Sequence, residues 1–525
     1  MRTPKAWCVH APSRRAALFV AVLAVAVVVF RGRAWFFPYG DASTGLYLHI
    51  AAALLDGHLP YTSAWDYRPP GLFALYAAAL ALFGPRLAWN VLTSLALGAT
   101  ALAVGLLARR LDARTPSSAA WCAAAFFVLL APENDGLWGN TEVEISAFVA
   151  WSLWFAMCDR RGFAAPLASG LLAGCALQCK LSALLLTLLP AAIILLGNGN
   201  AALKFRRASL FVAGFAAPIA VEVAAYVQAG VLPLLLFATF DATSRRAHEL
   251  NLDYYRANVR WLIGQLFILA PQIELALFAR PAFPAAALAS WGWLIAALAS
   301  IVLEGEFFHY HFILLAAPVA LLGALGFLRL LRRFAGSAAR RRAIWIAVFA
   351  LTFGLHDYYE TVQGATFAVH RRLLHDAGWR TDPTSALIAA LRRVAPGERS
   401  ILLVGQSPFV YDLLDVAAPT RFTAPVIWLD PRLSAMAGSD AQGELARLFR
   451  LQPNVAVVSK LDDPTYDPGR VRLLKRWLGL NYRPVFAATD FTIFRAIRAT
   501  RSASPRIVSR LERACARSER RARPG

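Results

Sequence analysis

Residues 33 to 86 bring together side chains whose types could do chemistry. This stretch carries Asp41, Asp66 and Arg68 among many aromatic residues, and it directly follows an apolar run. A carboxylate can act as a general base, and a guanidinium can hold a phosphate through two parallel hydrogen bonds. Because binding and catalytic residues gather on loops, a long loop with these groups is a candidate working surface.

The composition indicates that this loop lies at a membrane. Of the 525 residues, 58% are hydrophobic and only 16% are charged, whereas soluble domains carry about a quarter charged residues. A membrane helix needs about 20 apolar residues. We therefore expect an α-helical polytopic membrane protein with about eleven spans, each of roughly that length. The expected spans lie near residues 16–32, 87–108, 117–132, 143–158, 163–179, 181–197, 208–228, 258–279, 283–303, 309–330 and 342–357.

Basic residues fall in every second loop between these spans, a pattern typical of cytoplasmic loops. The basic loops are residues 108–114, 159–162, 204–207, 279–281 and 329–342. This alternation predicts a cytoplasmic N-terminus, and it accounts for the net charge of +22 without a nucleic-acid partner. The alanine- and arginine-rich composition is compatible with a bacterium, and we expect a multi-pass protein of a bacterial inner membrane.

The sequence pattern changes after residue 357, from long apolar runs to short helix and strand signals. We expect a transmembrane domain over residues 1–357, with its first external loop at 33–86, and then a small α/β domain over 358–500. In the latter, residues 454–460 are typical of a short strand and 484–496 of a terminal hairpin. The span count places this domain outside the cytoplasm, in the periplasm or the extracellular space. Residues 501–525 form an arginine-rich tail.

The first loop is expected to contain two helices lying at the membrane surface. One would begin after Asp41, and the other at the two prolines that follow Arg68, since proline suits the first turn of a helix. In isolation, Asp41 would be interpreted as an ordinary N-cap, and Arg68 as the partner of Asp66 in a surface salt bridge.

Several short motifs follow one another along the chain in a defined order. They are Asp41, Tyr47, "AALLDGHLPY" (52–61), "RPPG" (68–71), "LFG" (82–84), "GNTE" (139–142), Lys180 and "FFHYHFILLAAP" (307–318). In this order the sequence resembles the polytopic glycosyltransferases of the GT-C fold, in the branch of the protein O-mannosyltransferases and the lipid A aminoarabinose transferase. Two positions depart from that pattern: Ala42 replaces a second acid, and Arg68 replaces a lysine.

The resemblance implies transfer of a sugar from a polyprenyl-phosphate donor to an acceptor hydroxyl, with inversion of the anomeric centre. Asp41 would be the catalytic base and Glu142 a second carboxylate of the same site. The acceptor stays open between a lipid, a glycan and a protein. Glu142 could instead complement the dipole of its helix, and Glu144 is expected to be solvated.

The remaining candidates would bind substrate. Lys180 would pair with the donor phosphate, or it would simply extend to the membrane interface. Arg68, His309, Tyr310, His311 and Tyr61 complete this set, although an interfacial aromatic belt would also explain Tyr310. A divalent metal is conceivable, but no ligand set with familiar spacing indicates one, so no cofactor is assigned.

A transporter or flippase of lipid-linked substrates is the alternative function. It would require charged residues in the middle of spans and broken helices in two related halves. The polar groups instead lie mainly at the expected outer ends of the spans, which favours an enzyme working at one face of the membrane.

Overall fold

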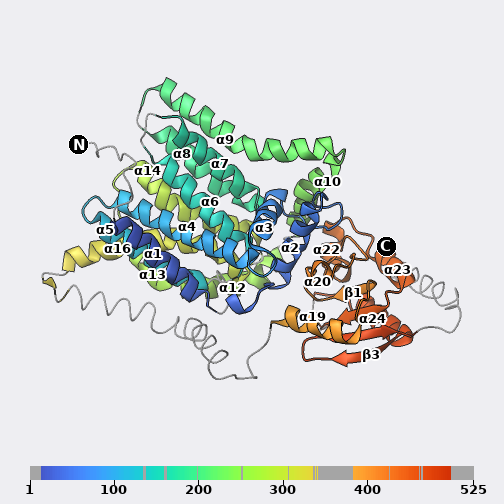
Figure 1. Ribbon diagram of the computed structural model, residues 1–525. Helices are drawn as coiled ribbons and strands as arrows, with labels where there is room; N and C mark the ends of the chain where they lie inside the picture. Colours follow the sequence, from blue (N-terminus) through green and yellow to red (C-terminus); the bar gives the residue numbers. More distant parts are fainter. Residues whose placement is uncertain are drawn as a thin grey trace. The chain divides into compact units, whose positions relative to one another are not determined.

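The computed structural model describes most of the chain (Figure 1). The described residues are 14–32, 34–133, 138–158, 162–197, 199–249, 252–305, 307–334, 337–338, 340, 382–424, 426–459, 461–462 and 465–497. The expected span at 342–357 and the basic tail at 501–525 lie outside them. The chain divides into two compact units. The first comprises residues 1–37, 90–222 and 252–379, and the second comprises residues 38–89, 223–251 and 380–525.

The described part of the first unit is helical. Its elements are α1 (Arg14–Phe30), η1 (Ala34–Phe36), α4 (Ala88–Leu111), α5 (Pro116–Glu133), α6 (Thr141–Ala156), α7 (Ala164–Leu177), η2 (Leu181–Ala183), α8 (Leu184–Leu196), α9 (Ala201–Gln228), α12 (Leu252–Ile268), α13 (Ala270–Ala276), α14 (Pro284–Ala287), η4 (Leu288–Gly292), α15 (Trp293–Glu304), η5 (His309–Phe312) and α16 (Ile313–Phe334). Two of them, α4 and α9, continue into the second unit.

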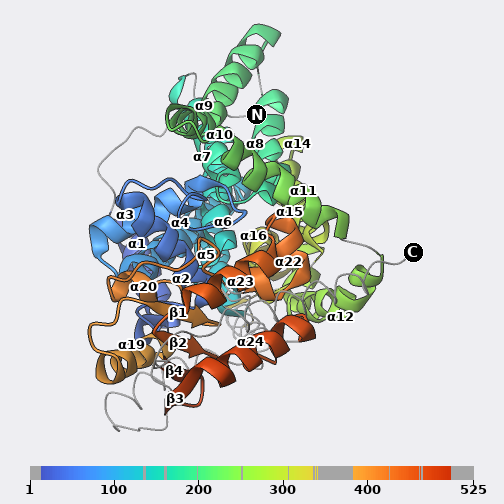
Figure 2. The same cartoon turned by 90° about the vertical axis from the view of Figure 1, so that its right-hand side faces the viewer.

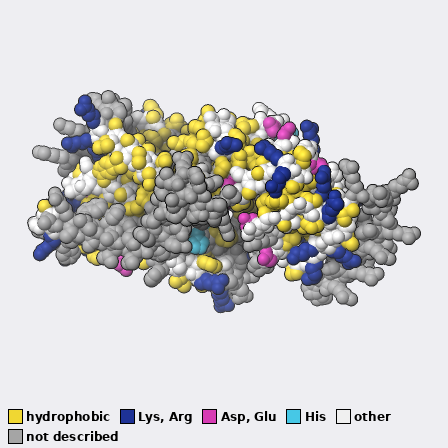
Figure 3. Space-filling model, turned by 60° about the horizontal axis from the view of Figure 1, so that its bottom comes forward, with side chains coloured by type: hydrophobic (Ala, Val, Ile, Leu, Met, Phe, Trp, Pro, Cys, Tyr) yellow, Lys and Arg dark blue, Asp and Glu magenta, His cyan; other side chains and the backbone are white. Residues whose placement is uncertain are grey.

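Four of the described helices are long and apolar enough to cross a membrane: residues 88–111, 201–228, 284–304 and 309–333. Shorter apolar helices cover residues 42–55, 70–83, 116–131, 164–177 and 181–196. Large apolar side chains such as Phe205, Val212 and Val221 on α9 are exposed, as lipid contact would require. Figure 3 shows many hydrophobic side chains among the described residues of the face in view. A polytopic helical protein is thus supported, while the number of spans stays a prediction.

Glycines bring α7 and α9 close together. A Cβ atom at Gly170 would meet the carbonyl oxygen of Phe211, and one at Gly174 would meet that of Phe215. On the facing helix, Gly214 would meet the carbonyl oxygen of Leu167 in the same way. Small residues four apart let helix backbones approach closely, which is how many membrane helices pack.

An ion pair fixes the ends of α4, α5 and α16. Asp112 follows α4 directly, and its Oδ2 accepts hydrogen bonds from Arg332 on α16 (2.6 Å) and from Thr115 (2.8 Å). Burial alone would raise the pKa of Asp112, but the hydrogen bonds from Arg332, Thr115 and the Arg114 amide outweigh it and hold the pKa below its usual range.

The second unit contains the first-loop helices α2 (Ala42–Leu55) and α3 (Pro70–Phe83) at the positions expected from the sequence. Its other elements are α10 (Leu232–Leu236), η3 (Phe237–Asp241), α11 (Ala242–Glu249), α19 (Pro383–Val394), β1 (Ile401–Val404), α20 (Val410–Leu413), α21 (Val426–Leu429), α22 (Pro431–Met436), α23 (Ala441–Leu451), β2 (Val455–Val458), α24 (Pro468–Asn481), β3 (Tyr482–Ala487) and β4 (Thr492–Ala496). That the first-loop helices lie on a membrane surface stays a prediction.

Four strands form one sheet in the order β1-β2-β4-β3 (Figure 2). β1 and β2 are parallel, with Ile401 opposite Val455, whereas β4 runs antiparallel to both β2 and β3. All residues of β1 (ILLV) and β2 (VAVV) are buried, as is usual for parallel strands covered on both faces. The strand and the hairpin expected from the sequence correspond to β2 and to β3–β4.

The contact of α7 with α9 predicts opposite outcomes for two glycine substitutions. Gly170→Ala should lower the melting temperature of the detergent-solubilised protein, because the new methyl group has no room against the α9 backbone and overpacking costs about 1–3 kcal/mol. Gly98→Ala is the matched control: a Cβ at this helical glycine meets nothing within 4 Å, so alanine should stabilise by roughly 0.5–1 kcal/mol. Equal shifts for both variants would contradict the proposed packing.

The lowered pKa of Asp112 predicts a pH-dependent stability. Because the folded-state pKa is depressed, its contribution is present above the unfolded value of about 3.9 and is lost as pH falls through the folded value. The free energy of unfolding of Asp112→Asn should therefore lie below that of the wild type at pH 6–7 and converge with it below about pH 4. Chemical denaturation across this range measures the difference. A constant gap between the two curves at all pH values would be inconsistent with this pairing.

Candidate functional site

Asp41 starts α2 as its N-cap residue. Its Oδ1 accepts a hydrogen bond from the Thr44 amide at 2.7 Å, and Gly40 precedes it with a φ of +67°, a conformation that glycine adopts without strain. Asp41 is exposed, whereas Thr44 and the following turn are buried. The capping role is therefore present, and it fixes one carboxylate oxygen at the start of a buried helix.

Arg68 is held in place by the acid and the aromatic residues of its own loop. Its Nη1 donates to Asp66 Oδ2 (2.9 Å) and Oδ1 (3.1 Å), and Asp66 is almost fully buried. The guanidinium also lies 5.0 Å from the ring centroids of Tyr47 on α2 and of Tyr67. The salt bridge considered from the sequence thus exists, and it fixes a cation beside the rings of Tyr47 and Tyr67.

Tyr61 supports this loop from within. Its backbone has a φ of +74°, which costs a non-glycine residue free energy of order 1–3 kcal/mol. Its ring is buried, and its hydroxyl donates a hydrogen bond to the Arg68 carbonyl oxygen. Tyr226, in the last turn of α9, donates a hydrogen bond from its hydroxyl to the Pro60 carbonyl oxygen at 3.1 Å. In this structure, then, Tyr61 orients the backbone that carries Arg68.

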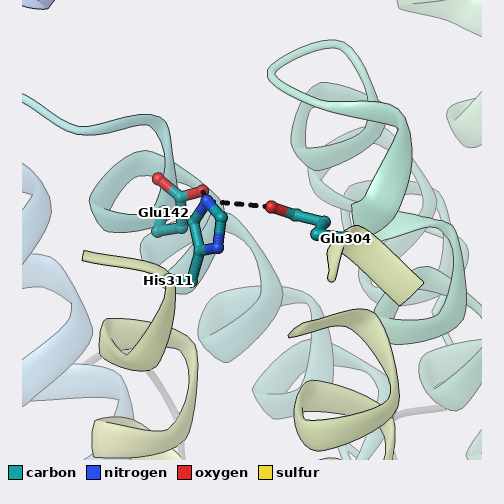
Figure 4. Close-up of side chains that lie close together, drawn as sticks. All are labelled: Glu142, Glu304 and His311. Carbon is teal, nitrogen blue, oxygen red and sulfur yellow. Dashed lines mark ion pairs between the residues drawn. The ribbon is translucent and has the colours of Figure 1, made fainter. Parts of the chain in front are cut away.

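A buried cluster of ions occupies the ends of several helices of the first unit. Lys180, between α7 and η2, places its Nζ 2.6 Å from Glu142 Oε1 and 2.6 Å from Glu304 Oε2. His311 in η5 places its Nε2 3.0 Å from Glu304 Oε2 and 3.9 Å from Glu142 Oε1. Thr141 donates to the other oxygen of Glu142 at 3.1 Å. Figure 4 shows Glu304 extending towards Glu142 and His311.

The cluster is deeply buried, since the side-chain exposures are 0% for Glu142, 8% for Lys180, 8% for Glu304 and 1% for His311. Charges taken out of water must be paired. The Lys180 ammonium contacts both carboxylates, and the His311 imidazole lies closest to that of Glu304. Glu142 is thus far more than a complement to a helix dipole, and Lys180 does not extend freely into solvent.

Glu304 was not identified from the sequence. It ends α15, and Gly305 follows in the left-handed conformation (φ +70°), which turns the chain and brings His311 back towards the acid. The acid precedes His311 by seven residues in "EGEFFHYH". The closeness of this acid to His311 in the sequence was the only hint of their contact, and an ordinary outer loop would explain it equally well.

The three residues of "HYH" do different things. His311 joins the cluster, whereas His309 is exposed, lies 2.6 Å from Gln265 Nε2 through its Nδ1, and packs edge-on against Trp261. Tyr310 is edge-on to His311 at 4.6 Å between ring centroids.

The expectation for Glu144 was wrong: this side chain is buried, and neither of its carboxyl oxygens has a hydrogen-bond partner within the described residues. The whole first turn of α6 is enclosed.

Glu142, Glu304 and His311 could hold a metal ion, because their ligand atoms lie within 4.8 Å of one another. Two carboxylates and an imidazole are a familiar donor set for zinc or manganese. However, the Lys180 ammonium contacts both carboxylates. A divalent ion and this ammonium would compete for the same oxygens, so the residues fit a metal only when Lys180 withdraws.

The expected site residues thus fall into two groups. Asp41, Tyr61 and Arg68 belong to the second unit, whereas Glu142, Lys180, His309, Tyr310 and His311 belong to the first. Within the first unit the structure unites Glu142, Lys180 and His311. Within the second it unites Arg68 and Tyr61.

The fold is similar to that of solved GT-C glycosyltransferases. The crystal structure of ArnT from Cupriavidus metallidurans bound to undecaprenyl phosphate has a TM-score of 0.57 at 16% sequence identity, covering 93% of this chain and 100% of ArnT. The apo form of ArnT gives a TM-score of 0.56 at 15% sequence identity, with the same coverage of both chains. AglB from Archaeoglobus fulgidus gives a TM-score of 0.46 at 13% sequence identity, covering 93% of this chain and 75% of AglB. No family model and no curated protein sequence matches the chain.

The ion cluster predicts that Lys180→Ala is strongly destabilising, because two buried carboxylates lose their cation; breaking a buried pair costs about 3–5 kcal/mol. Thermal melting in detergent measures this. Zn²⁺ should raise the melting temperature of Lys180→Ala more than that of the wild type, since the three ligands are then open.

The matched control for that experiment removes one of the three candidate metal ligands in addition to Lys180. Lys180→Ala combined with Glu304→Ala should respond no more to Zn²⁺ than the wild type does. If the single variant melted like the wild type, the cluster would not carry the energetic role assigned to it.

Proposed function

We propose that this protein is a membrane glycosyltransferase that moves a sugar from a polyprenyl-phosphate donor to an acceptor hydroxyl outside the cytoplasm, with inversion. The observation that carries this proposal is the likeness of fold to ArnT over the whole length of that protein. The ArnT crystal structure contains undecaprenyl phosphate, which supports a lipid-phosphate donor of the same chemical class. The acceptor is a lipid, a glycan or a protein.

The proposed reaction is a single displacement. The acceptor oxygen attacks the anomeric carbon, its proton passes to Asp41, and the bond from that carbon to the phosphate oxygen breaks. The phosphate leaves with the electron pair as polyprenyl phosphate. Asp41 suits the base because it is exposed at the start of α2 and the Thr44 amide already orients its carboxylate. Positioned general bases contribute about 10²–10⁴-fold in rate.

The other candidates take supporting roles in this proposal. Arg68, fixed by Asp66 and flanked by tyrosine rings, is the first candidate to hold the departing phosphate, because a guanidinium matches phosphate geometry. Glu142 orients the acceptor as the second carboxylate. Lys180 shares its ammonium with Glu142 and Glu304, so in our proposal it acts on the phosphate only together with them.

His309, Tyr310 and His311 remain proposed contacts of the sugar or phosphate, while Tyr61 acts through the Arg68 backbone. The protein would lie in a bacterial inner membrane, with a cytoplasmic N-terminus and a periplasmic C-terminal domain. The transporter alternative is less well supported, because Glu142 lies in the first turn of α6, Glu304 ends α15 and Lys180 lies between two helices. These groups are at helix ends rather than in the middle of spans.

Substitution of Asp41 tests the proposal. Purified protein in lipid nanodiscs would be incubated with a panel of polyprenyl-phosphate sugars and hydroxyl acceptors, and donor consumption would be followed by mass spectrometry. We expect turnover of at least one donor, and a loss of about 10²–10⁴-fold in kcat for Asp41→Asn. Asparagine is an equally good N-cap, so α2 should stay intact.

Asp56→Asn provides the matched control, because Asp56 is an exposed acid at the opposite end of α2. It should retain wild-type turnover. Turnover by Asp41→Asn equal to that of the wild type would remove Asp41 from the role of base. Turnover of no donor by the wild type would contradict the proposed function itself.

A further inference from the structure

One face of α2 carries three residues spaced four apart. Asp41 caps the helix, Gly45 follows one turn later, and His49 follows after a second turn. Residues at this spacing lie one above the other on a helix. The two residues that follow Asp41 on this face both meet the segment between β1 and the end of α20, residues 405–413, of the C-terminal α/β domain. This domain and the first loop belong to the same compact unit.

Gly45 provides the closest approach. A Cβ atom at this position would overlap the Oγ of Ser407, which follows β1 and is 6% exposed. The chain reaches this position through Gly405, whose φ of +74° favours glycine. The side chain of Ser407 therefore occupies the space that a Cβ atom at position 45 would need.

His49 provides the second contact. Its Nδ1 lies 2.7 Å from Asp412 Oδ2, and the side chains are 10% and 23% exposed. Tyr411 packs near the His49 ring, and its hydroxyl accepts a hydrogen bond from the Leu403 amide of β1 at 3.0 Å. Burial raises the pKa of the Asp412 carboxyl, although the hydrogen bond with His49 opposes this. The short helix α20 thus connects α2 to the sheet.

The rest of the loop is attached to the same domain. The Trp65 amide donates to the Arg421 carbonyl oxygen at 2.9 Å, and the rings of Trp65 and Phe422 lie 6.1 Å apart. Just before Asp41, Tyr39 lies 6.2 Å from Phe409 between ring centroids. Contacts therefore flank Asp41 on both sides along the chain, and another lies close to Arg68.

Provided that the protein is the glycosyltransferase proposed above, we propose that the C-terminal domain sets the position of the catalytic base, with Ser407 and Asp412 as positioning residues that act on Asp41 through Gly45 and His49. A misplacement of about 1 Å can lower a rate about 10²-fold. A helix held at Gly45 in its first turn and at His49 in its second resists sliding and rotation, so its N-cap carboxylate keeps one place relative to the acceptor hydroxyl.

The decisive test uses complementary volumes in the full-length protein. Gly45→Ala should lower kcat at least tenfold with the KM for the donor unchanged, because the added methyl group displaces α2 from Ser407. Alanine is the better helix former, so loss of helix propensity would not explain the defect. Combining Gly45→Ala with Ser407→Gly restores the space and should recover most of the lost kcat. Lack of recovery, with both proteins folded by circular dichroism, would overturn the inference.

The hydrogen bond supplies an independent series. Asp412→Asn keeps an acceptor for His49 and should retain most of kcat, whereas Asp412→Ala should lose at least as much as Gly45→Ala. Asp415→Asn, an exposed acid in the same domain, is the matched control and should behave as the wild type. Equal activity of Asp412→Ala and the wild type would overturn the role assigned to Asp412.

Hydrogen exchange separates this inference from the proposed function. Asp412→Ala should increase amide exchange in residues 42–49 but not in α16, whether or not any sugar donor is found. Unchanged exchange in α2 would overturn the positioning contact alone. If the wild type consumed no donor while this exchange difference appeared, the proposed function would fail and the contact between α2 and the C-terminal domain would stand.

Discussion

The buried pairing of Lys180 with Glu142 and Glu304 is the interaction on which the first unit depends. It joins the start of α6, the break between α7 and η2, and the end of α15 at a single nitrogen atom. His311 adds the beginning of the α16 segment through Glu304. Taking such charges out of water is costly unless the pairing is well made. A shift of one of these helix ends would leave a carboxylate without its cation, so the pairing keeps the helix ends in register.

In the second unit, contacts between distant parts of the chain hold the first loop. Its helix α2 packs closely against, and is hydrogen-bonded to, an α/β domain encoded more than 300 residues later, as in the pairing of His49 with Asp412. A loop that carries a catalytic group must be held rigidly, because the efficiency of a general base depends on its geometry. In our proposal, the C-terminal domain serves the chemistry by holding α2 in place.

The sequence predicted a good part of this arrangement. Apolar length and the two prolines after Arg68 located α2, α3 and most of the long helices, because those signals are local. The residues Glu142, Lys180 and His311 were recognised individually, but their contact could not be predicted, since it depends on how distant helices pack. Glu304 was missed because a left-handed Gly305 redirects the chain. Glu144 was expected in solvent because its burial depends on neighbours outside its own helix. The helix at 258–279 was expected to be continuous but divides into α12 and α13.

The most direct test of the account is the stereochemistry of one turnover by the wild-type protein. A donor of defined anomeric configuration would be converted in nanodiscs, and the product would be analysed by NMR together with the released lipid. Direct displacement by a base-activated hydroxyl predicts an inverted glycosidic bond and one polyprenyl phosphate for each sugar transferred. A product with retained configuration, or a donor moved across the membrane with its sugar still attached, would contradict it.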